Sequence, residues 1–191
     1  MLKKHSRLMA LVMAAALSGV SAVSAFADTF KIDPVHSSVV FKIKHANVSY
    51  VYGRFNTVAG TFTLDGDKST VEAAAPIASV DTNNPKRDEH IKGPDFFNAK
   101  QFAEVSFKST KIESKDGKLS VTGDLTLHGV TKPITVPLEV FGQGPGMGPG
   151  EIRAGIGGEF TVKRSDYGMD KMLPMIGDDV TLMIALEGVK Q

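Results

Sequence analysis

Four histidines after residue 27 are the side chains in this sequence best suited to acid–base chemistry: His36, His45, His90 and His128. Imidazole gains and loses a proton near neutral pH, so each could act as a general base or bind a metal. His36 and His45 are nine residues apart. This odd separation puts them on opposite faces of a continuous strand, so a shared metal site would need a bulge or ligands from elsewhere.

Other familiar catalytic patterns do not occur in the sequence. There is no cysteine, which excludes thiolate catalysis, disulfide bonds and cysteine-ligated zinc. No serine after residue 27 lies in a G-x-S-x-G motif or begins S-x-x-K, the patterns of two large groups of serine enzymes. Enzymatic chemistry would therefore depend on scattered Asp, Glu and His, and we predict that the protein is not an enzyme.

The densest polar cluster is formed by Arg87, Asp88 and His90. Pro85 and the charged residues after it favour a short helix that ends at Gly93-Pro94. Side chains on its first turns could cap the helix, pair with one another or meet a polar ligand group. The cluster is thus either a solvated surface or one wall of a binding site.

The elements that would position these side chains are strands, because apolar and polar residues alternate along most of the chain. Such alternation turns one face of each strand toward an apolar interior and the other toward water. Glycine-containing turns, such as the one at Asp116-Gly117, separate successive runs as antiparallel hairpins require. The alternating runs include residues 39–45, 61–65, 104–108, 124–128, 134–140, 160–162 and 180–187.

About eight strands at hairpin spacing predict an all-β fold, either a closed antiparallel barrel or a sandwich. The stretch around residues 85–97 is expected to be a long connection with a short helix, and residues 142–150, rich in Gly and Pro, a flexible loop between two strands. Asp178-Asp179 is expected to form a turn before the last strand. Within the alternation at 61–65, Phe62 should point inward and Thr63 outward.

Closing eight strands leaves an interior that side chains just fill or that holds one small ligand. Both arrangements remain open here. Met169, Met172 and Met175 lie in one loop, which either forms an adaptable apolar wall or plugs the end of the barrel. The residues that we expect to line a pocket are Phe41, Ile43, Phe62, Leu64, Phe96, Phe97, Phe102, Phe107, Leu125, Leu127, Val136, Leu138, Phe160, Val162, Met169, Met172, Leu182 and Ile184.

Residues 1–27 have the features of a cleaved secretory signal peptide. Lys3, Lys4 and Arg7 precede an apolar run, and Ala25-Phe26-Ala27 forms an A-x-A cleavage site. Its removal would change the formal net charge from +1 to −2, because it holds three basic residues and no acidic one. We therefore expect an exported domain over residues 28–191 that neither binds nucleic acid nor inserts stably in a membrane.

Several motifs, taken together, resemble the YceI-like family of exported proteins. The most specific is the block from Gly123 to Pro133, which contains the sequence GDLTLHGVTKP. One departure is Ile91, where the family usually has leucine in its R-D-x-H-L segment. The other matching segments and residues are 30–41, His45, 53–55, 60–62, 79–84, 87–97, Phe102, Phe107, 109–110 and 164–168.

This resemblance implies an extended, eight-stranded, lipocalin-like barrel with a long apolar pocket. It implies a periplasmic protein that binds a polyisoprenoid, a quinone-like lipid or another long amphipathic lipid, with proposed roles in quinone handling and stress response. It implies no cofactor and no metal. Some members of the family look dimeric, so a homodimer is also left open.

If a lipid tail occupies the barrel, polar groups at one mouth should select its head group. Asp81, Asn83, Arg87 and His90 are our candidates, because they lie together on the long connection near a predicted barrel end. Two other functions stay open at this point. One is an enzyme acting on an apolar substrate with His36, His45 or His90 as its base, and the other is a ligand-free module that binds another protein.

Overall fold

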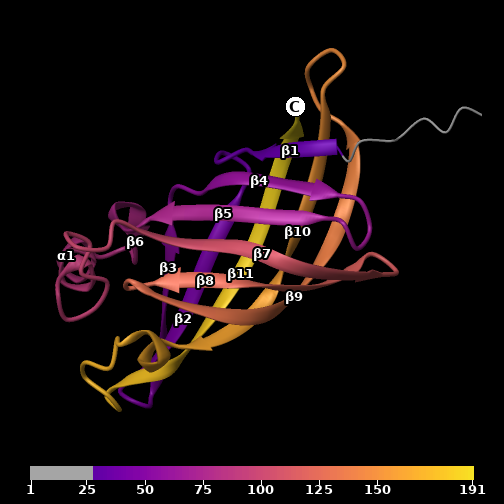
Figure 1. The fold of residues 1–191 in the computed structure, drawn as a ribbon. Coiled ribbons are helices and arrows are strands. Elements are labelled where there is room, and N and C mark those ends of the chain that lie inside the picture. Colours follow the sequence, from indigo (N-terminus) through magenta and orange to yellow (C-terminus); the bar gives the residue numbers. More distant parts are fainter. Residues whose placement is uncertain (1–27) are drawn as a thin grey trace, which may run out of the picture.

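The computed structural model describes residues 28–191, so the expected signal peptide at residues 1–27 lies outside the described residues. Strands dominate, with one α-helix and two short 3-10 helices (Figure 1). In chain order the elements are β1 (Asp28–Ile32), β2 (Ser38–His45), β3 (Ser49–Phe55), β4 (Ala59–Leu64), β5 (Thr70–Pro76), η1 (Ile77–Ser79), β6 (Val80–Asp81), α1 (Pro85–Lys92), β7 (Glu104–Lys115), β8 (Lys118–Leu127), β9 (Val130–Pro145), β10 (Ile152–Lys163), η2 (Arg164–Tyr167) and β11 (Ile176–Lys190).

The strands form one antiparallel sheet that closes on itself. Its hydrogen-bonded order runs β1-β4-β5-β7-β8-β9-β10-β11, and the pairing of β1 with β11 completes the ring. The predicted eight-stranded antiparallel barrel is therefore confirmed. β2, β3 and β6 extend the same sheet beyond β11, because β11 is long enough to pair with β1 near one end and with β2 near the other.

Aromatic packing closes the barrel where β1, β4 and β11 meet. Phe30 and Phe62 are both fully buried, and their rings stack with centroids 5.3 Å apart. Gly188 on β11 leaves room for them, since a Cβ there would lie 2.7 Å from the Cβ of Phe30. The inward direction of Phe62 is thus confirmed, and the main apolar core begins at this seam.

At the other end of the molecule the sheet is incomplete. β6 has two residues and pairs with β3 (Arg54 with Asp81, Phe55 with Val80), and no pairing joins it to β7 within residues 28–191. The helix α1 lies beside β6 at this end (Figure 1). The Asn84 side chain caps α1 by accepting a hydrogen bond from the Arg87 backbone N–H at 3.0 Å, and Pro85 takes the first helical position.

Three sequence-based expectations about local structure are wrong. The loop expected at residues 142–150 is shorter, because β9 continues to Pro145 and Gly144 pairs with Arg153 of β10. Asp178 and Asp179 belong to β11, beside a bulge in its pairing with β2. His36 does not share a continuous strand with His45, because it lies in the turn before β2. In each case backbone pairing with a distant strand, which local sequence does not reveal, decided where the strand begins or ends.

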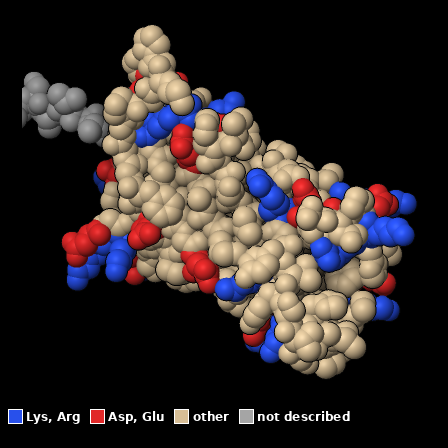
Figure 2. Space-filling view, turned by 180° about the vertical axis from the view of Figure 1, so that it is seen from behind, with Lys and Arg blue, Asp and Glu red and all other residues tan. Residues whose placement is uncertain are grey.

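Charged side chains are distributed over the outside of the barrel. On the face in Figure 2, Lys and Arg lie beside Asp and Glu, with no separate basic patch on that face. Ion pairs such as Lys163 with Asp179, at 2.8 Å, are exposed. Pairs of this kind contribute little to stability, so the fold depends on its interior.

A pair of adjacent substitutions tests the inward and outward faces of β4. Phe62→Glu should abolish folding or lower the free energy of unfolding by more than about 4 kcal/mol, because it buries an unpaired charge. Thr63→Glu should lower the free energy of unfolding by about 1 kcal/mol, because it removes the hydrogen bond between the Thr63 and Thr70 hydroxyls. Urea unfolding followed by circular dichroism measures both, and equal effects would contradict the assigned faces.

Candidate functional site

The larger of two adjoining cavities lies at the α1 end of the barrel and has a volume of about 300 Å³. Its wall is mostly apolar and comes from the inner faces of β2, β3, β7, β8, β10 and β11, with α1 and the segment after η2. Because exposed residues such as His45 and His90 are part of this wall, the cavity reaches the surface. The lining residues are Val39, Phe41, Ile43, His45, Val51, Phe55, Thr82, Arg87, His90, Ile91, Phe96, Phe97, Val105, Leu125, Leu127, Val162, Arg164, Met169, Met172, Ile176, Val180 and Leu182.

A second cavity of about 90 Å³ lies deeper in the barrel. The two cavities have Val39, Val105, Leu125 and Leu182 in common, so they adjoin across these four side chains. Alanines of β5 leave the space that larger residues would fill. The lining residues of the second cavity are Val39, Val58, Val71, Ala73, Ala74, Ala75, Val105, Ser106, Phe107, Leu125, Val136, Leu138, Phe160, Leu182, Ile184 and Leu186.

Most of the apolar residues expected around a pocket line one of these cavities. The larger cavity contains Phe41, Ile43, Phe96, Phe97, Leu125, Leu127, Val162, Met169, Met172 and Leu182. The deeper cavity adds Phe107, Val136, Leu138, Phe160 and Ile184.

Three expected residues lie elsewhere. Phe62 is fully buried in the closing seam, where Phe30 fills the space beside it. Leu64 is the last residue of β4 and packs against the core. Phe102 contacts His128, with ring centroids 4.8 Å apart, on the connection before β7. Phe62 and Leu64 pack in the apolar core, whereas Phe102 packs against an imidazole ring. Strand alternation could not show that these three side chains lie outside the two cavity walls.

Arg87 and His90 on α1 reach the cavity. The Arg87 Nε donates to the Thr82 hydroxyl at 2.8 Å and its Nη2 to the Thr82 carbonyl at 2.6 Å, which fixes the guanidinium beside the opening. The His90 ring lies edge-on to Phe96, and its Nε2 is 3.7 Å from a carboxylate oxygen of Asp95. Both polar groups therefore lie next to aromatic and aliphatic wall.

Asp81 and Asn83 do not line either cavity. The Asp81 carboxylate accepts hydrogen bonds from the Asn83 backbone N–H at 2.7 Å and from the Asn56 side chain at 3.2 Å. These bonds, that of Asn83 first, lower the pKa of Asp81. Asp81 thus fixes its own turn and joins it to the segment after β3. The sequence alone could not distinguish this structural role from a binding site.

Arg164 is a buried cation that the sequence analysis missed. Its side chain is 2% exposed, and its Nε donates to the Gly177 carbonyl at 2.8 Å. Nη2 donates to the carbonyls of Lys171 and Ile176 at 2.9 and 3.0 Å, and Nη1 donates to that of Met169. Burial lowers the pKa of this guanidinium. The sequence marked residues 164–168 as a family-like segment, but it could not show the burial of Arg164, because the partners of this side chain are backbone carbonyls.

These bonds shape the loop between η2 and β11. Met169 and Met172 become cavity wall, and Met175 is 55% exposed. Arg164 therefore holds the loop that contains Met169 and Met172 against the cavity.

Other lining residues could have been found in the sequence. The alternation that places Phe41 and Ile43 inward includes Val39, and that of Leu182 includes Val180. The remaining polar residues of the larger cavity wall are Thr82 and His45. All its titratable residues are Arg or His, with no Asp or Glu among the lining side chains of the described chain. The polar end of the cavity therefore favours an acidic or hydrogen-bonding group.

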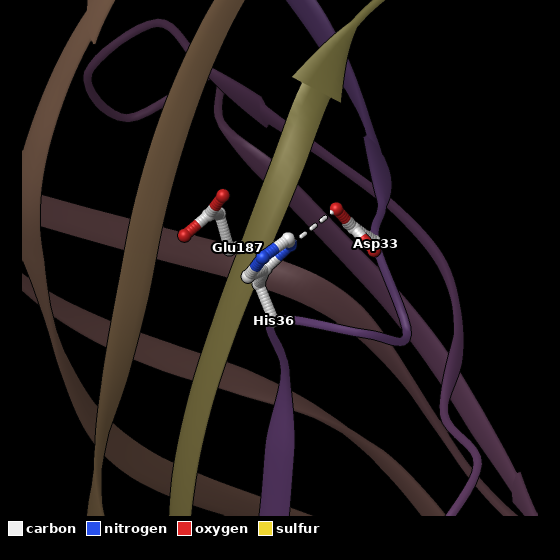
Figure 3. A group of neighbouring side chains, drawn as sticks. All are labelled: Asp33, His36 and Glu187. Atoms are coloured by element: carbon white, nitrogen blue, oxygen red, sulfur yellow. Dashed lines mark hydrogen bonds and ion pairs between the residues drawn. The ribbon is translucent and has the colours of Figure 1, made fainter. Parts of the chain in front are cut away.

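A second polar cluster lies at the opposite end of the barrel, where Asp33 and His36 of the β1–β2 turn approach Glu187 of β11 (Figure 3). Their ligand-type atoms are all within 4.8 Å of one another. Arg153 of β10 already occupies this cluster. Its Nη1 donates to Asp33 at 2.8 Å and to Glu187 at 2.5 Å. We call this arrangement of Arg153, Asp33, His36 and Glu187 the ionic clasp. A metal ion is disfavoured there, because it would meet the fixed positive charge of Arg153.

The chain matches the family model described as the YceI-like domain over residues 30–188. It is also 38% identical to a UPF0312 protein of Pseudomonas aeruginosa (strain LESB58), across all of both chains. Protein YceI of Escherichia coli O157:H7 is 39% identical, covering 90% of this chain and 92% of its own.

The chain belongs to the YceI-like family. Solved structures agree with this YceI-like fold. A YceI protein of Campylobacter jejuni is 31% identical with a TM-score of 0.70, covering 78% of this chain and 91% of its own. The BcnA protein of Burkholderia cenocepacia has a TM-score of 0.74 at 24% identity, covering 82% and 98%. A polyisoprenoid-binding domain from Saccharophagus degradans has a TM-score of 0.64 at 14% identity, covering 85% and 98%. The last two likenesses show the fold alone.

Among residues 28–191, no helix is long and apolar enough to cross a bilayer.

The ionic clasp makes the stability of this YceI-like barrel depend on pH. Hydrogen bonds to Asp33 from His36 first, then from Arg153, hold its pKa well below the ordinary value of 3.8. A carboxyl group with a depressed pKa stabilises the fold above its unfolded pKa and loses that effect as the pH falls through the folded pKa. Asp33→Asn should therefore lower the urea midpoint at neutral pH, and its difference from wild type should shrink as the pH falls below 3.8.

The exposed Asp124 provides the matched control. Asp124→Asn should leave the urea midpoint close to wild type from neutral pH to acid. A gap between wild type and Asp33→Asn that stays constant across this range would contradict the assigned clasp.

Proposed function

We propose that this protein binds the long apolar tail of an amphipathic lipid, such as a polyisoprenoid, inside its barrel and carries or sequesters that lipid. The observation behind the proposal is the pair of adjoining apolar cavities, one reaching the surface and one deeper in the barrel. Membership of the YceI-like family supports it. So does the likeness in fold to a domain described as polyisoprenoid-binding.

The wall suits a flexible hydrocarbon. Transfer of each methylene from water to an apolar wall contributes about 0.8 kcal/mol. Immobilising the tail's rotatable bonds offsets part of this gain. Met169 and Met172 can adapt their shape because methionine side chains are unbranched and flexible. The cavity can therefore follow a tail whose branches differ from one ligand to another.

The polar end of the cavity suits an acidic head group. Arg87, His90 and Arg164 lie along the same wall. Arg164 has its N–H groups engaged with carbonyls, so it contributes charge, whereas Arg87 bonds through Nε and Nη2 and keeps Nη1 for a ligand. Guanidinium groups bind phosphate and carboxylate strongly. We infer a lipid that ends in one of these groups, held beside Arg87.

We place the protein in the periplasm, as an exported binding protein without catalytic activity. Support for export comes from the signal-peptide features of residues 1–27. His45 and His90 line the cavity, and no serine or threonine hydroxyl of the described chain hydrogen-bonds to either. Such a pairing is the mark of an activated nucleophile, so binding is the function that the geometry favours.

Blocking the junction between the cavities tests tail binding. Leu182 lines both cavities, whereas Thr181 lies half-buried on the other face of β11 and lines neither. Leu182→Trp should leave the binding of a short prenyl alcohol intact and weaken that of a long one by about tenfold or more, because the deeper space is closed. Thr181→Trp should bind both as wild type does. Native mass spectrometry of the delipidated proteins measures occupancy, and wild type without any bound prenyl lipid would refute the proposal.

A neighbouring pair of residues tests the head group. Arg87→Met should reduce the preference for a prenyl phosphate over the prenyl alcohol of equal length by about tenfold, the loss of one charge-assisted contact. Lys86→Met, at an exposed position one residue earlier, should leave the preference unchanged. The ratio of the two affinities is the readout, since a looser α1 alone would weaken both ligands. An unchanged ratio in Arg87→Met would remove Arg87 from the head-group site.

A further inference from the structure

Large apolar side chains are exposed together at the barrel end that holds the main cavity. Val48, in the turn between β2 and β3, is 83% exposed, and Tyr50 follows on β3 at 53%. In the loop before β11, Met172, Leu173 and Met175 are 44%, 39% and 55% exposed. We call these five residues the apolar tip.

The two segments of the apolar tip form one surface. The Ala46 backbone N–H donates to the Met175 carbonyl at 2.7 Å, and His45 pairs with Ile176 at the ends of β2 and β11. In Figure 1 the turn and the loop lie side by side at the lower end of the barrel. Figure 2 shows this end, at the lower right, as a surface without Lys, Arg, Asp or Glu except at its margins.

The apolar tip is continuous with the cavity. Met172 belongs to both, since it is 44% exposed and also lines the cavity wall. His45 and Ile176, which flank the contact between the two segments, line the same cavity. An apolar molecule passing over the tip would therefore reach the cavity along a wall of methionine and isoleucine without entering bulk water.

We propose that the apolar tip rests on the surface of a lipid bilayer, so that lipid passes directly between the membrane and the cavity. This inference rests on the proposed function. A lipid with a long apolar tail has little solubility in water, so a binding protein gains by meeting the membrane with the mouth of its cavity. Exposed Tyr, Leu, Val and Met suit the boundary between head groups and acyl chains.

The charges beside the tip nearly cancel. Lys42 pairs with Glu159 at 3.6 Å and Lys171 with Asp95 at 3.8 Å, and the exposed Lys44 and Asp170 have opposite signs. The apolar side chains, more than electrostatic attraction, would therefore hold the tip on a bilayer. A protein partner or a second copy of this chain would also cover an apolar surface, but neither accounts for a cavity that opens at its edge.

Two double variants with the same residue types separate the tip from exposed apolar residues in general. Val48→Asp with Met175→Asp alters the tip at positions outside both cavity walls. Val35→Asp with Met147→Asp alters side chains that are 81% and 97% exposed, in the β1–β2 turn and the β9–β10 hairpin at the opposite end (Figure 1). The probe is co-flotation with vesicles of phosphatidylethanolamine and phosphatidylglycerol. Binding of a prenyl alcohol in vesicle-free buffer is measured in parallel.

Wild type and the opposite-end variant should float with the vesicles, and the tip variant should partition about tenfold less or below detection. All three should bind the prenyl alcohol equally in vesicle-free buffer. Unchanged flotation of the tip variant, or a wild type that does not float, would overturn the docking surface and leave lipid binding intact. So would a wild-type dimer that the tip variant dissociates, because the tip would then cover a second copy.

Absence of prenyl binding in buffer combined with tip-dependent flotation would refute the lipid cargo and retain the docking surface. The two hypotheses therefore fail in different experiments.

Discussion

Closure of the sheet by the pairing of β1 with β11 is the constraint on which the other features of this protein depend. Phe30, Lys31 and Ile32 pair with Lys190, Val189 and Gly188, so the first and last strands of the described chain seal the barrel. Closure satisfies the backbone groups at what would otherwise be open sheet edges, and it turns the inner side chains into an enclosed apolar space. Gly188 is necessary there, since any larger side chain would collide with Phe30 and Phe62.

The site exists because the two ends of this barrel are finished differently. Near the closing seam, aromatic side chains fill the interior, and the clasp of Arg153 with Asp33 and Glu187 joins β10, the β1–β2 turn and β11. At the other end β6 stops after two residues, and α1 with Phe96 and Phe97 covers the space instead of another stretch of sheet. Arg87, His90 and Ile91 of this helix form one wall of the cavity.

The buried Arg164 shows how polarity and shape are linked at the cavity. A buried cation is costly unless its N–H groups are satisfied, and here backbone carbonyls of a single loop satisfy them. The same bonds bring Met169 and Met172 into the cavity wall. Asp178 and Asp170 lie near enough to act on this charge, and they oppose the effect of burial on the pKa of Arg164. Neither carboxylate lines the cavity, whose titratable side chains are Arg and His.

Period-two alternation by itself determined the all-β class and the inward face of residues such as Phe41 and Phe62. Pro85 and the charged residues after it determined the short helix. Both signals depend only on neighbours within a few residues. The YceI-like motifs added the barrel. Tertiary structure alone decided how far each strand extends, as at Gly144 and Asp178, and that Phe62 packs in the seam while Leu182 lines the cavities. It also decided the role of Arg164 and the separation of Arg87 and His90 from Asp81 and Asn83. The strand ends depend on partner strands that are distant in sequence. The role of Arg164 depends on backbone carbonyls, which every residue type has. No local pattern of side chains could therefore predict either.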